Sequence, residues 1–297
     1  MTNEIKKLDL TNDYLFKRTF GYVGQERITK TFLSDLFLEK IDEISLNNST
    51  ITEKDIMTDK MGIMDIKAVI DKNIQCDIEM QVVAQDDIAE RILFYMSREY
   101  KKSINKGESY KSLNKTIAVL VADFELKNIS NVPKYATKWN FREEDYPEVI
   151  LTEAMEIYII ELPKLTKHAK NTNKERLNLW AEFIKNPEVK IMIDENDDEK
   201  TVETKKTIQK AQETYEQLQN DKHEMELAEL RLKYILDQNS IRNSGYREGK
   251  EAGEKDGAQK EKIEIAKKLL EQDVNIRTIV TATGLSKEEI EELKKTL

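Results

Sequence analysis

The sequence predicts an α/β fold in which a mixed sheet flanked by helices is followed by a helical C-terminal region. Apolar residues recur at helical spacing over 12–40 and at every second position over 42–84, and from residue 173 onward almost the whole pattern is helical. With 39% hydrophobic residues among 297, the chain has enough apolar material for one large core or two ordinary domains.

The first elements are a helix over 12–40, which glycines break near Gly21, and then three strands. Those strands are expected in ISLNNSTI, MGIMDIKAVI and IQCDIEMQVV, where apolar and polar residues alternate. A helix over 87–106 follows, and Gly107 stands where a C-terminal cap belongs.

Two apolar segments complete the predicted sheet. TIAVLVADF, at 116–124, has the continuous apolar run of a buried strand, and VILTEAMEIYIIEL adds one or two strands after a loop that holds Pro133 and Pro147. The expected total is five or six strands.

Composition excludes several kinds of chemistry. The 57 acidic and 48 basic residues give a net charge of −9, so the protein has no broadly basic coat for nucleic acid. Cys76, His168 and His223 are too few to build a structural zinc site or a Cys/His protease. The motifs of nucleotide hydrolysis and dinucleotide binding do not occur, so we expect no nucleotide cofactor.

The first residues of the chain and its single cysteine indicate the subcellular location. MTNEIKKLDLTNDYLF holds no apolar core of a signal peptide, and one cysteine cannot form an internal disulfide. We therefore expect a cytoplasmic protein with no membrane partner.

The segment MDIKAVIDKNIQCDIEMQ is predicted to form a hairpin. If residues 71–73 form its loop, with Asn73 in the left-handed conformation that asparagine tolerates, every pair on one face is apolar. A slip of one residue would exchange the two faces, so the apolar pattern favours this register.

On the other face of this hairpin, Asp65 lies opposite Glu79 and Lys67 lies opposite Asp77. Two opposed carboxylates repel each other, and a helix packed across them would strengthen the repulsion by removing water. A hard cation such as Mg²⁺ would compensate, because it binds one or two carboxylates and keeps positions for water and phosphate oxygens. The alternative is a solvated hairpin in which lysines soften the charge.

Seven segments carry a family resemblance that runs through nearly the whole chain. They are NDYLFKRTFG (12–21), GIMDIKA (62–68), DIEMQ (77–81), RILFYMSREY (91–100), GESYKSLNKTIAVLVADF (107–124), EIYIIELPKL (156–165) and TGLSKEEIEEL (283–293). In this order they resemble the Rpn family of recombination-promoting nucleases, a transposase-like family of the PD-(D/E)XK nuclease superfamily.

The resemblance implies a DNA endonuclease that depends on Mg²⁺, with Mn²⁺ as a substitute ion. Asp65 matches the superfamily's strand aspartate and Glu79 its second acidic ligand, so these two would hold the metal. Gln81 stands where the superfamily has lysine and where this family usually has glutamine; its amide can orient a water but carries no charge. Lys67, on the face of Asp65, could replace that charge in part.

Further candidates come from two helices and from the hairpin. Asp13 and Lys17 match the family's opening motif, and Asp13 is either a carboxylate near the metal or one that interacts with its helix dipole. Asp77 is a further possible site carboxylate. Lys17, Arg91 and Arg98 are candidates for contacts with DNA phosphate.

The C-terminal region shows a glycine series and a helix-turn-helix pattern. The glycines at 245, 249, 253 and 257 are typical of a flexible linker or of a helix whose backbone is closely approached, and we favour the helix. The segment after residue 263 resembles a helix-turn-helix, with Ser286 and Glu289 as a capping box, but its last helix opens with acidic residues. Packing or oligomer contact is therefore expected there.

These patterns predict three regions and a homo-oligomer. The apolar residues after residue 200 are too sparse for a core of their own, so either the catalytic domain or another copy of the chain must cover them. We favour another copy, bound through the C-terminal helices. The expected regions are a PD-(D/E)XK-like nuclease domain (1–195), a long helical linker or oligomerisation region (196–260) and a small helical segment (261–297).

Three functions are compatible with these features. The leading hypothesis is a metal-dependent DNA endonuclease linked to recombination, transposition-like events or defence against foreign DNA. The alternative is a catalytically inactive, oligomeric DNA-binding or mobile-element accessory protein. A helical scaffold is the third, and it would require that the chain itself covers the charged face of the hairpin.

Overall fold

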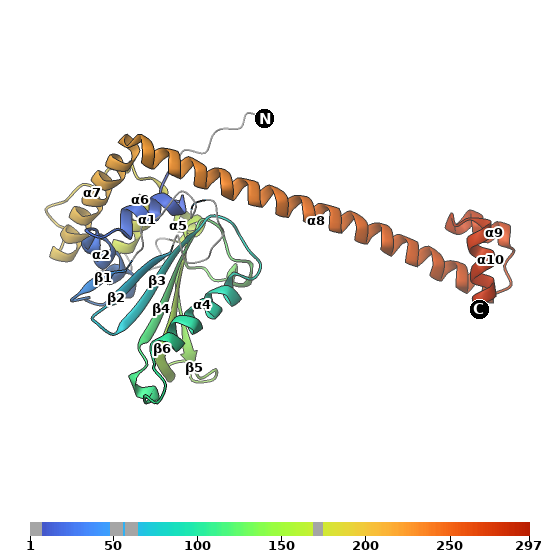
Figure 1. Ribbon diagram of the computed structural model, residues 1–297, viewed down its shortest axis with the longest axis horizontal. Helices are drawn as coiled ribbons and strands as arrows, with labels where there is room; N and C mark the ends of the chain where they lie inside the picture. Colours follow the sequence, from blue (N-terminus) through green and yellow to red (C-terminus); the bar gives the residue numbers. More distant parts are fainter. Residues whose placement is uncertain (1–7, 48–55, 57–64, 169–174) are drawn as a thin grey trace. The chain divides into compact units, whose positions relative to one another are not determined.

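A six-stranded mixed sheet forms the centre of the fold (Figure 1). The computed structural model describes residues 8–47, 56, 65–168 and 175–297. The strands are β1 (Ile44–Leu46), β2 (Ile66–Ile70), β3 (Ile74–Gln81), β4 (Lys115–Ala122), β5 (Ala136–Arg142) and β6 (Ile150–Glu161). Their order in the sheet is β1-β2-β3-β4-β6-β5, with β3, β4 and β6 parallel and the other neighbours antiparallel.

Helices lie on both faces of this sheet, which confirms the predicted α/β class. The α-helices are α1 (Asp13–Phe20), α2 (Glu26–Phe37), α4 (Ile88–Lys102), α5 (Leu165–His168), α6 (Glu175–Lys185), α7 (Glu199–Asn220), α8 (Lys222–Glu271), α9 (Ile276–Thr283) and α10 (Lys287–Thr296). Short 3₁₀ turns are η1 (Tyr110–Ser112), η2 (Lys127–Ile129) and η3 (Leu162–Lys164).

The larger core lies on the face that α1, α2, α6 and α7 cover (Figure 1). Its centre is an aromatic cluster in which Phe20 packs against Phe32 and Trp180. On the opposite face α4 packs on the sheet, where Ile88 and Ile92 join a smaller apolar cluster. The fold thus has three layers, and α4 covers the face on which the charged side of the hairpin lies.

The β2–β3 hairpin has the predicted register. Ile66 pairs with Ile78, Lys67 with Asp77, and Ile70 with Ile74. The expected continuation of β2 toward residue 61 falls on 57–64, which lie outside the described residues.

The hairpin loop corrects one detail of the prediction. Asp71 and Lys72, with φ of 47° and 70°, adopt the left-handed conformation, and Asn73 does not. The backbone N–H of Asn73 instead donates a hydrogen bond to the Ile70 carbonyl oxygen at 3.2 Å, which closes the turn.

Two other local predictions were wrong. Gly107 has a positive φ but lies beyond α4, whose last residue is Lys102 and whose cap is Ser103. The segment expected as a loop between two prolines contains β5, which pairs with β6 through register shifts between Trp139 and Arg142.

The chain divides into two compact units, Met1–Tyr234 and Ile235–Leu297. The apolar side chains of α7 are buried in the core of the first unit, so the expectation that another copy covers them is wrong; they include Ile208, Ala211, Tyr215 and Leu218. In the second unit, Ala266, Ile279, Leu285 and Ile290 form a small core.

Helix α8 runs without interruption through the glycine series, as favoured from the sequence. A Cβ added at Gly245, Gly249, Gly253 or Gly257 would meet no atom within 4 Å. In the part of the chain that the structure describes, no helix combines the length and the apolar character needed to cross a membrane.

Candidate active site

Three carboxylates gather in a small pocket between the sheet and α4. Alternation along β3 directs Asp77 and Glu79 to the α4 face, and Asp65 immediately precedes β2. Together with Tyr95 and Glu99 of α4, they line a cavity of about 40 Å³. Helix α4 thus covers the charged face only in part, because the side chain of Glu79 keeps 26% of its exposure.

Burial and mutual repulsion destabilise the charged forms of these carboxylates. Burial raises the pKa of Asp65 well above its ordinary range, and the charges of Asp77 and Glu79 raise it further. Burial also raises the pKa of Asp77 to about 6, against the opposing charge of Lys67. A positive charge placed among these groups would therefore be strongly favoured.

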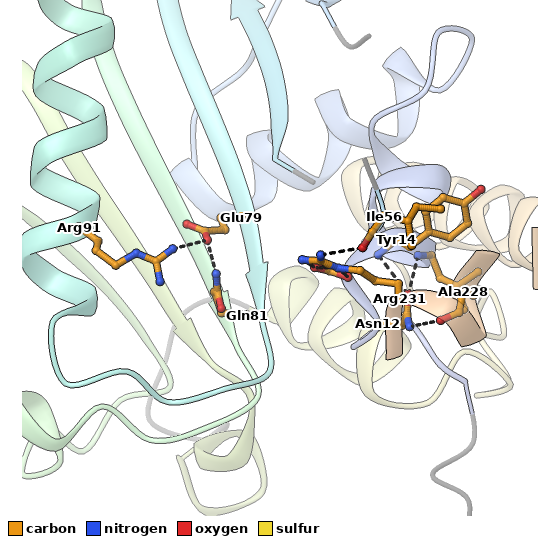
Figure 2. Close-up of polar contacts among 10 residues, drawn as sticks. Asn12, Tyr14, Ile56, Glu79, Gln81, Arg91, Ala228 and Arg231 are labelled. Carbon is orange, nitrogen blue, oxygen red and sulfur yellow. Dashed lines mark hydrogen bonds and ion pairs between the residues drawn. The ribbon is translucent and has the colours of Figure 1, made fainter. Parts of the chain in front are cut away.

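Glu79 already has two polar partners (Figure 2). The Gln81 amide Nε2 donates to Glu79 Oε1, and the Arg91 Nη2 atom lies 3.6 Å from the same oxygen. Arg91 thus comes from α4 to the site carboxylate, whereas the sequence suggested only a contact with DNA phosphate. Its side chain retains 19% of its exposure.

Lys67 has its ammonium near Glu99, and its charge also lowers the pKa of Asp65 and of Asp77 against the larger effect of burial. Its Nζ atom is 3.7 Å from Glu99 Oε1, and its side chain is 38% exposed. Glu99 belongs to the site but was not predicted, because no sequence pattern shows which residues of α4 will face the hairpin.

Asp13 is held in a buried ion pair away from the pocket. Arg231, from α8, donates from Nε and Nη2 to Asp13 Oδ2 at 2.9 and 2.7 Å, and from Nη1 to the Ile56 carbonyl oxygen at 3.2 Å. Figure 2 shows Arg231 and its partners apart from the group of Glu79, Gln81 and Arg91. The structure therefore gives Asp13 a packing role in joining α1 to α8, and it is not among the pocket residues.

The remaining candidates for phosphate contact differ in exposure. The side chain of Arg98 is half exposed, with its guanidinium carbon 5.5 Å from the centre of the Tyr95 ring. Lys17 has an exposed fraction of only 2%. A surface contact with DNA is thus open to Arg98, whereas Lys17 lies inside the first unit.

The donor chemistry of the pocket fits a hard divalent cation. Carboxylate oxygens are the ligands that Mg²⁺ prefers. Asp77 Oδ1 is buried without a hydrogen-bond partner among the described residues, which is unfavourable unless a ligand satisfies it. Within the described ranges, however, no three His, Cys, Asp or Glu side chains already stand in the arrangement of a metal site.

Sequence profiles match most of the chain. The profile described as PD-(D/E)XK nuclease family transposase matches residues 10–245, and the one described as Rpn/YhgA-like nuclease family, C-terminal HTH domain, matches residues 259–295. Neither a search of curated proteins nor one of solved structures gave a match.

Proposed function

Because the chain belongs to the PD-(D/E)XK nuclease family of transposases, we propose that it is a metal-dependent DNA endonuclease whose reaction takes place at the pocket of Asp65, Asp77 and Glu79. The observation that carries this proposal is the gathering of three repelling carboxylates on one sheet face beneath α4. An arrangement that raises the pKa of two carboxyl groups is unfavourable for a purely structural role, and it is common where function requires it.

Each site residue is assigned a separate role in the proposed reaction. Asp65 and Glu79 would hold Mg²⁺, or Mn²⁺ as a substitute, with Asp77 as a further oxygen donor. When bound, the ion would neutralise phosphate charge and make water a better nucleophile. Gln81 is placed to orient the attacking water, because its amide already reaches the carboxylate of Glu79.

Arg91 supplies a charge at the site that is suited to binding phosphate. Its contact with Glu79 holds the guanidinium beside a carboxylate that lines the pocket. A guanidinium freed from that carboxylate can form paired hydrogen bonds with phosphate oxygens.

Cleavage of supercoiled plasmid by the full chain tests this function. We expect Mg²⁺-dependent cleavage that EDTA stops and that Asp65→Ala or Glu79→Ala lowers by about 100-fold or more. Glu90→Ala, on the exposed side of α4, is the matched control and should cleave like the wild type. Undiminished cleavage by a folded Asp65→Ala variant, with a normal circular dichroism spectrum, would contradict the proposal.

One observation favours the inactive alternative. Glu79 is engaged by Gln81 and Arg91, and among the described residues no ready metal arrangement exists. A DNA-binding accessory protein would bind DNA at the same affinity with and without Mg²⁺ and would leave the plasmid intact.

The match to a helix-turn-helix domain supports DNA as the partner. The first helix of the matched pair, α9, carries Arg277, whereas the exposed side of α10 carries Glu288, Glu291 and Glu292. The exposed lysines of α10, Lys287, Lys294 and Lys295, lie at its two ends, so the first turns that would face phosphate are mainly acidic. Homo-oligomerisation through the second unit therefore remains part of the proposal. We place the activity in the cytoplasm, in recombination, transposition-like events or defence against foreign DNA.

A further inference from the structure

Another cavity lies on the α4 face of the sheet, beyond the carboxylate pocket. Helix α4 packs mainly against β3 and β4, so the same face of β6 and β5 extends past it. The space over these two strands is a cavity of about 500 Å³, within the size range of ligand-binding pockets. Its lining is largely apolar and includes Ile92, Phe124, Leu126, Trp139, Ile157 and Ile159.

The charged residues at this cavity are already paired. Among the described residues that line it, Lys127 is the one cation, and its Nζ atom lies 2.6 Å from Asp86 Oδ1. Glu125 Oε1 lies 3.1 Å from Lys167 Nζ. A phosphate group would have to compete with a carboxylate for Lys127, whereas a neutral ligand leaves both ion pairs intact. The cavity therefore suits a neutral and largely apolar group.

Two aromatic rings and two side-chain amides line the same cavity. The indole of Trp139 is held by a hydrogen bond of 2.8 Å from Nε1 to Thr137 Oγ1, and Phe124 packs against the apolar cluster beneath α4. Gln85 and Asn128 contribute the amides. Nucleobases stack on aromatic side chains, and amides form hydrogen bonds with the edges of the bases. This combination of groups fits a planar, neutral base.

The cavity is close to the carboxylates. Ile92 of α4 lines both the cavity and the carboxylate pocket, and Arg91, the residue before it, extends to Glu79 (Figure 2). Across the sheet, Glu79 pairs with Leu120 of β4, which pairs with Ile159 of β6. Two strand spacings amount to about 10 Å. A nucleotide that flanks a phosphate bound at the carboxylates can therefore place its base in the cavity.

We propose that this cavity receives an unstacked nucleobase of the DNA substrate, next to the phosphate that is cut. This inference rests on the proposed nuclease function, and it names the substrate class. Trp139 and Phe124 provide the stacking surface, and Gln85 and Asn128 contact the edge of the base. The preferred substrates are single strands, loops and mismatches, because a base of an intact duplex must first be unpaired and unstacked before it can enter.

Binding of DNA to the full chain in Ca²⁺, which takes the same oxygen ligands as Mg²⁺, tests the cavity without relying on cleavage. The probes are a single-stranded oligonucleotide, the same strand in a duplex, and a fully abasic strand of equal length. Iodide quenching of tryptophan fluorescence reports occupancy, because of the two tryptophans Trp139 is 39% exposed and Trp180 is fully buried. We expect the single strand to shield Trp139 from iodide and the abasic strand to leave it accessible.

Two variants alter the cavity, and a third is the control. Trp139→Ala removes a stacking surface, and Ala89→Phe places a ring in the cavity from α4. Each should weaken binding of the single strand by about tenfold and keep binding of the duplex within about twofold of the wild type. Phe141→Ala is the matched control, because Phe141 is an exposed aromatic residue of the same strand that does not line the cavity. It should bind both probes like the wild type.

Several results would overturn the assignment of the cavity. Wild-type binding of the single strand by Trp139→Ala and Ala89→Phe would do so, as would equal shielding of Trp139 by the abasic strand or an equal loss in Phe141→Ala. If Trp139→Ala does not fold, Ala89→Phe decides. If the wild type shows base-dependent shielding but cuts no DNA in Mg²⁺, the nuclease function fails and the cavity assignment stands. If it cuts plasmid without base-dependent shielding, the function stands and the cavity assignment fails.

Discussion

Helix α7 and the stretch of α8 after Tyr234 have similar compositions but opposite surroundings. Both are rich in lysine, glutamate and glutamine. Ile208 on α7 has no exposed surface, whereas Ile241 on α8 is 66% exposed. The two helices differ in which residues accompany the apolar ones. On α7 the buried side also contains three threonines, Thr204, Thr207 and Thr214. A helix that appears too polar for a core can therefore belong to one if its threonines lie on the apolar side.

The same contrast holds for charged side chains. Asp77 in the first unit has its pKa raised by burial, whereas a hydrogen bond from Lys268 lowers the pKa of Glu264, an exposed residue of α8. Identical chemical groups thus favour opposite protonation states, because one is desolvated and the other is paired in water.

The largest expected difference comes from placing a charge on each helix. Ile208→Asp should lower the free energy of unfolding by about 4 kcal/mol or more, because it buries an unpaired carboxylate in the core of the first unit. Ile241→Asp should leave it almost unchanged. Urea unfolding followed by tryptophan fluorescence measures both, since Trp180 lies in that core. Equal effects would remove the distinction between the two helices.

A smaller difference is expected in the pH dependence of stability without metal. The pKa of Asp77 in the folded chain, about 6, is above its ordinary value of 3.8. The protonated form therefore stabilises the fold below about pH 4, and this contribution, of order 2–3 kcal/mol, is lost as the pH rises through 6. Asp77→Asn should lose that dependence and be more stable than the wild type at pH 7.5.

Urea unfolding in EDTA between pH 4.5 and 7.5 measures this effect. Glu264→Gln is the matched control and should follow the wild-type profile of the first unit. A difference between Asp77→Asn and the wild type that stays constant over this range would show that burial does not raise the pKa of Asp77.

The smallest expected difference is between the effects on stability of replacing a glycine in each unit. Gly21→Ala should destabilise the first unit by about 1–2 kcal/mol through the clash with Ile66, whereas Gly249→Ala should stabilise α8 by about 0.5–1 kcal/mol. Thermal unfolding measures the first change, and hydrogen exchange of the amides near Gly249 measures the second. Light scattering adds a further test: if Gly249→Ala lowers the oligomer's mass, the glycines permit close helix contact between copies.

The hairpin could be predicted because its information is local. Strict alternation over β2 and β3 fixes one register, and that register places Asp77 and Glu79 on one face. Strand β5 was missed because its register shifts between Trp139 and Arg142 interrupt the period of two by which a strand is recognised.

The partners of the site residues could not be predicted, because they are distant in sequence. Asp13 pairs with Arg231, which is 218 positions away, and no pattern near Asp13 indicates that contact. Lys17 resembles any helical lysine in the sequence, and no pattern near it indicates that its side chain is buried in the first unit. The sequence thus predicted the carboxylates but not the cations around them.

The continuity of α8 across Tyr234 affects how the protein would respond to proteolysis. Its first turns contribute Leu227, Ala228 and Arg231 to the first unit, whereas the glycine-containing turns have solvated side chains. Those later turns depend on the helix's own hydrogen bonds, so they open locally while the core of the first unit stays closed. A protease would therefore cleave beyond Tyr234, inside a helix, and release a fragment that still contains α7 and the pair of Asp13 and Arg231.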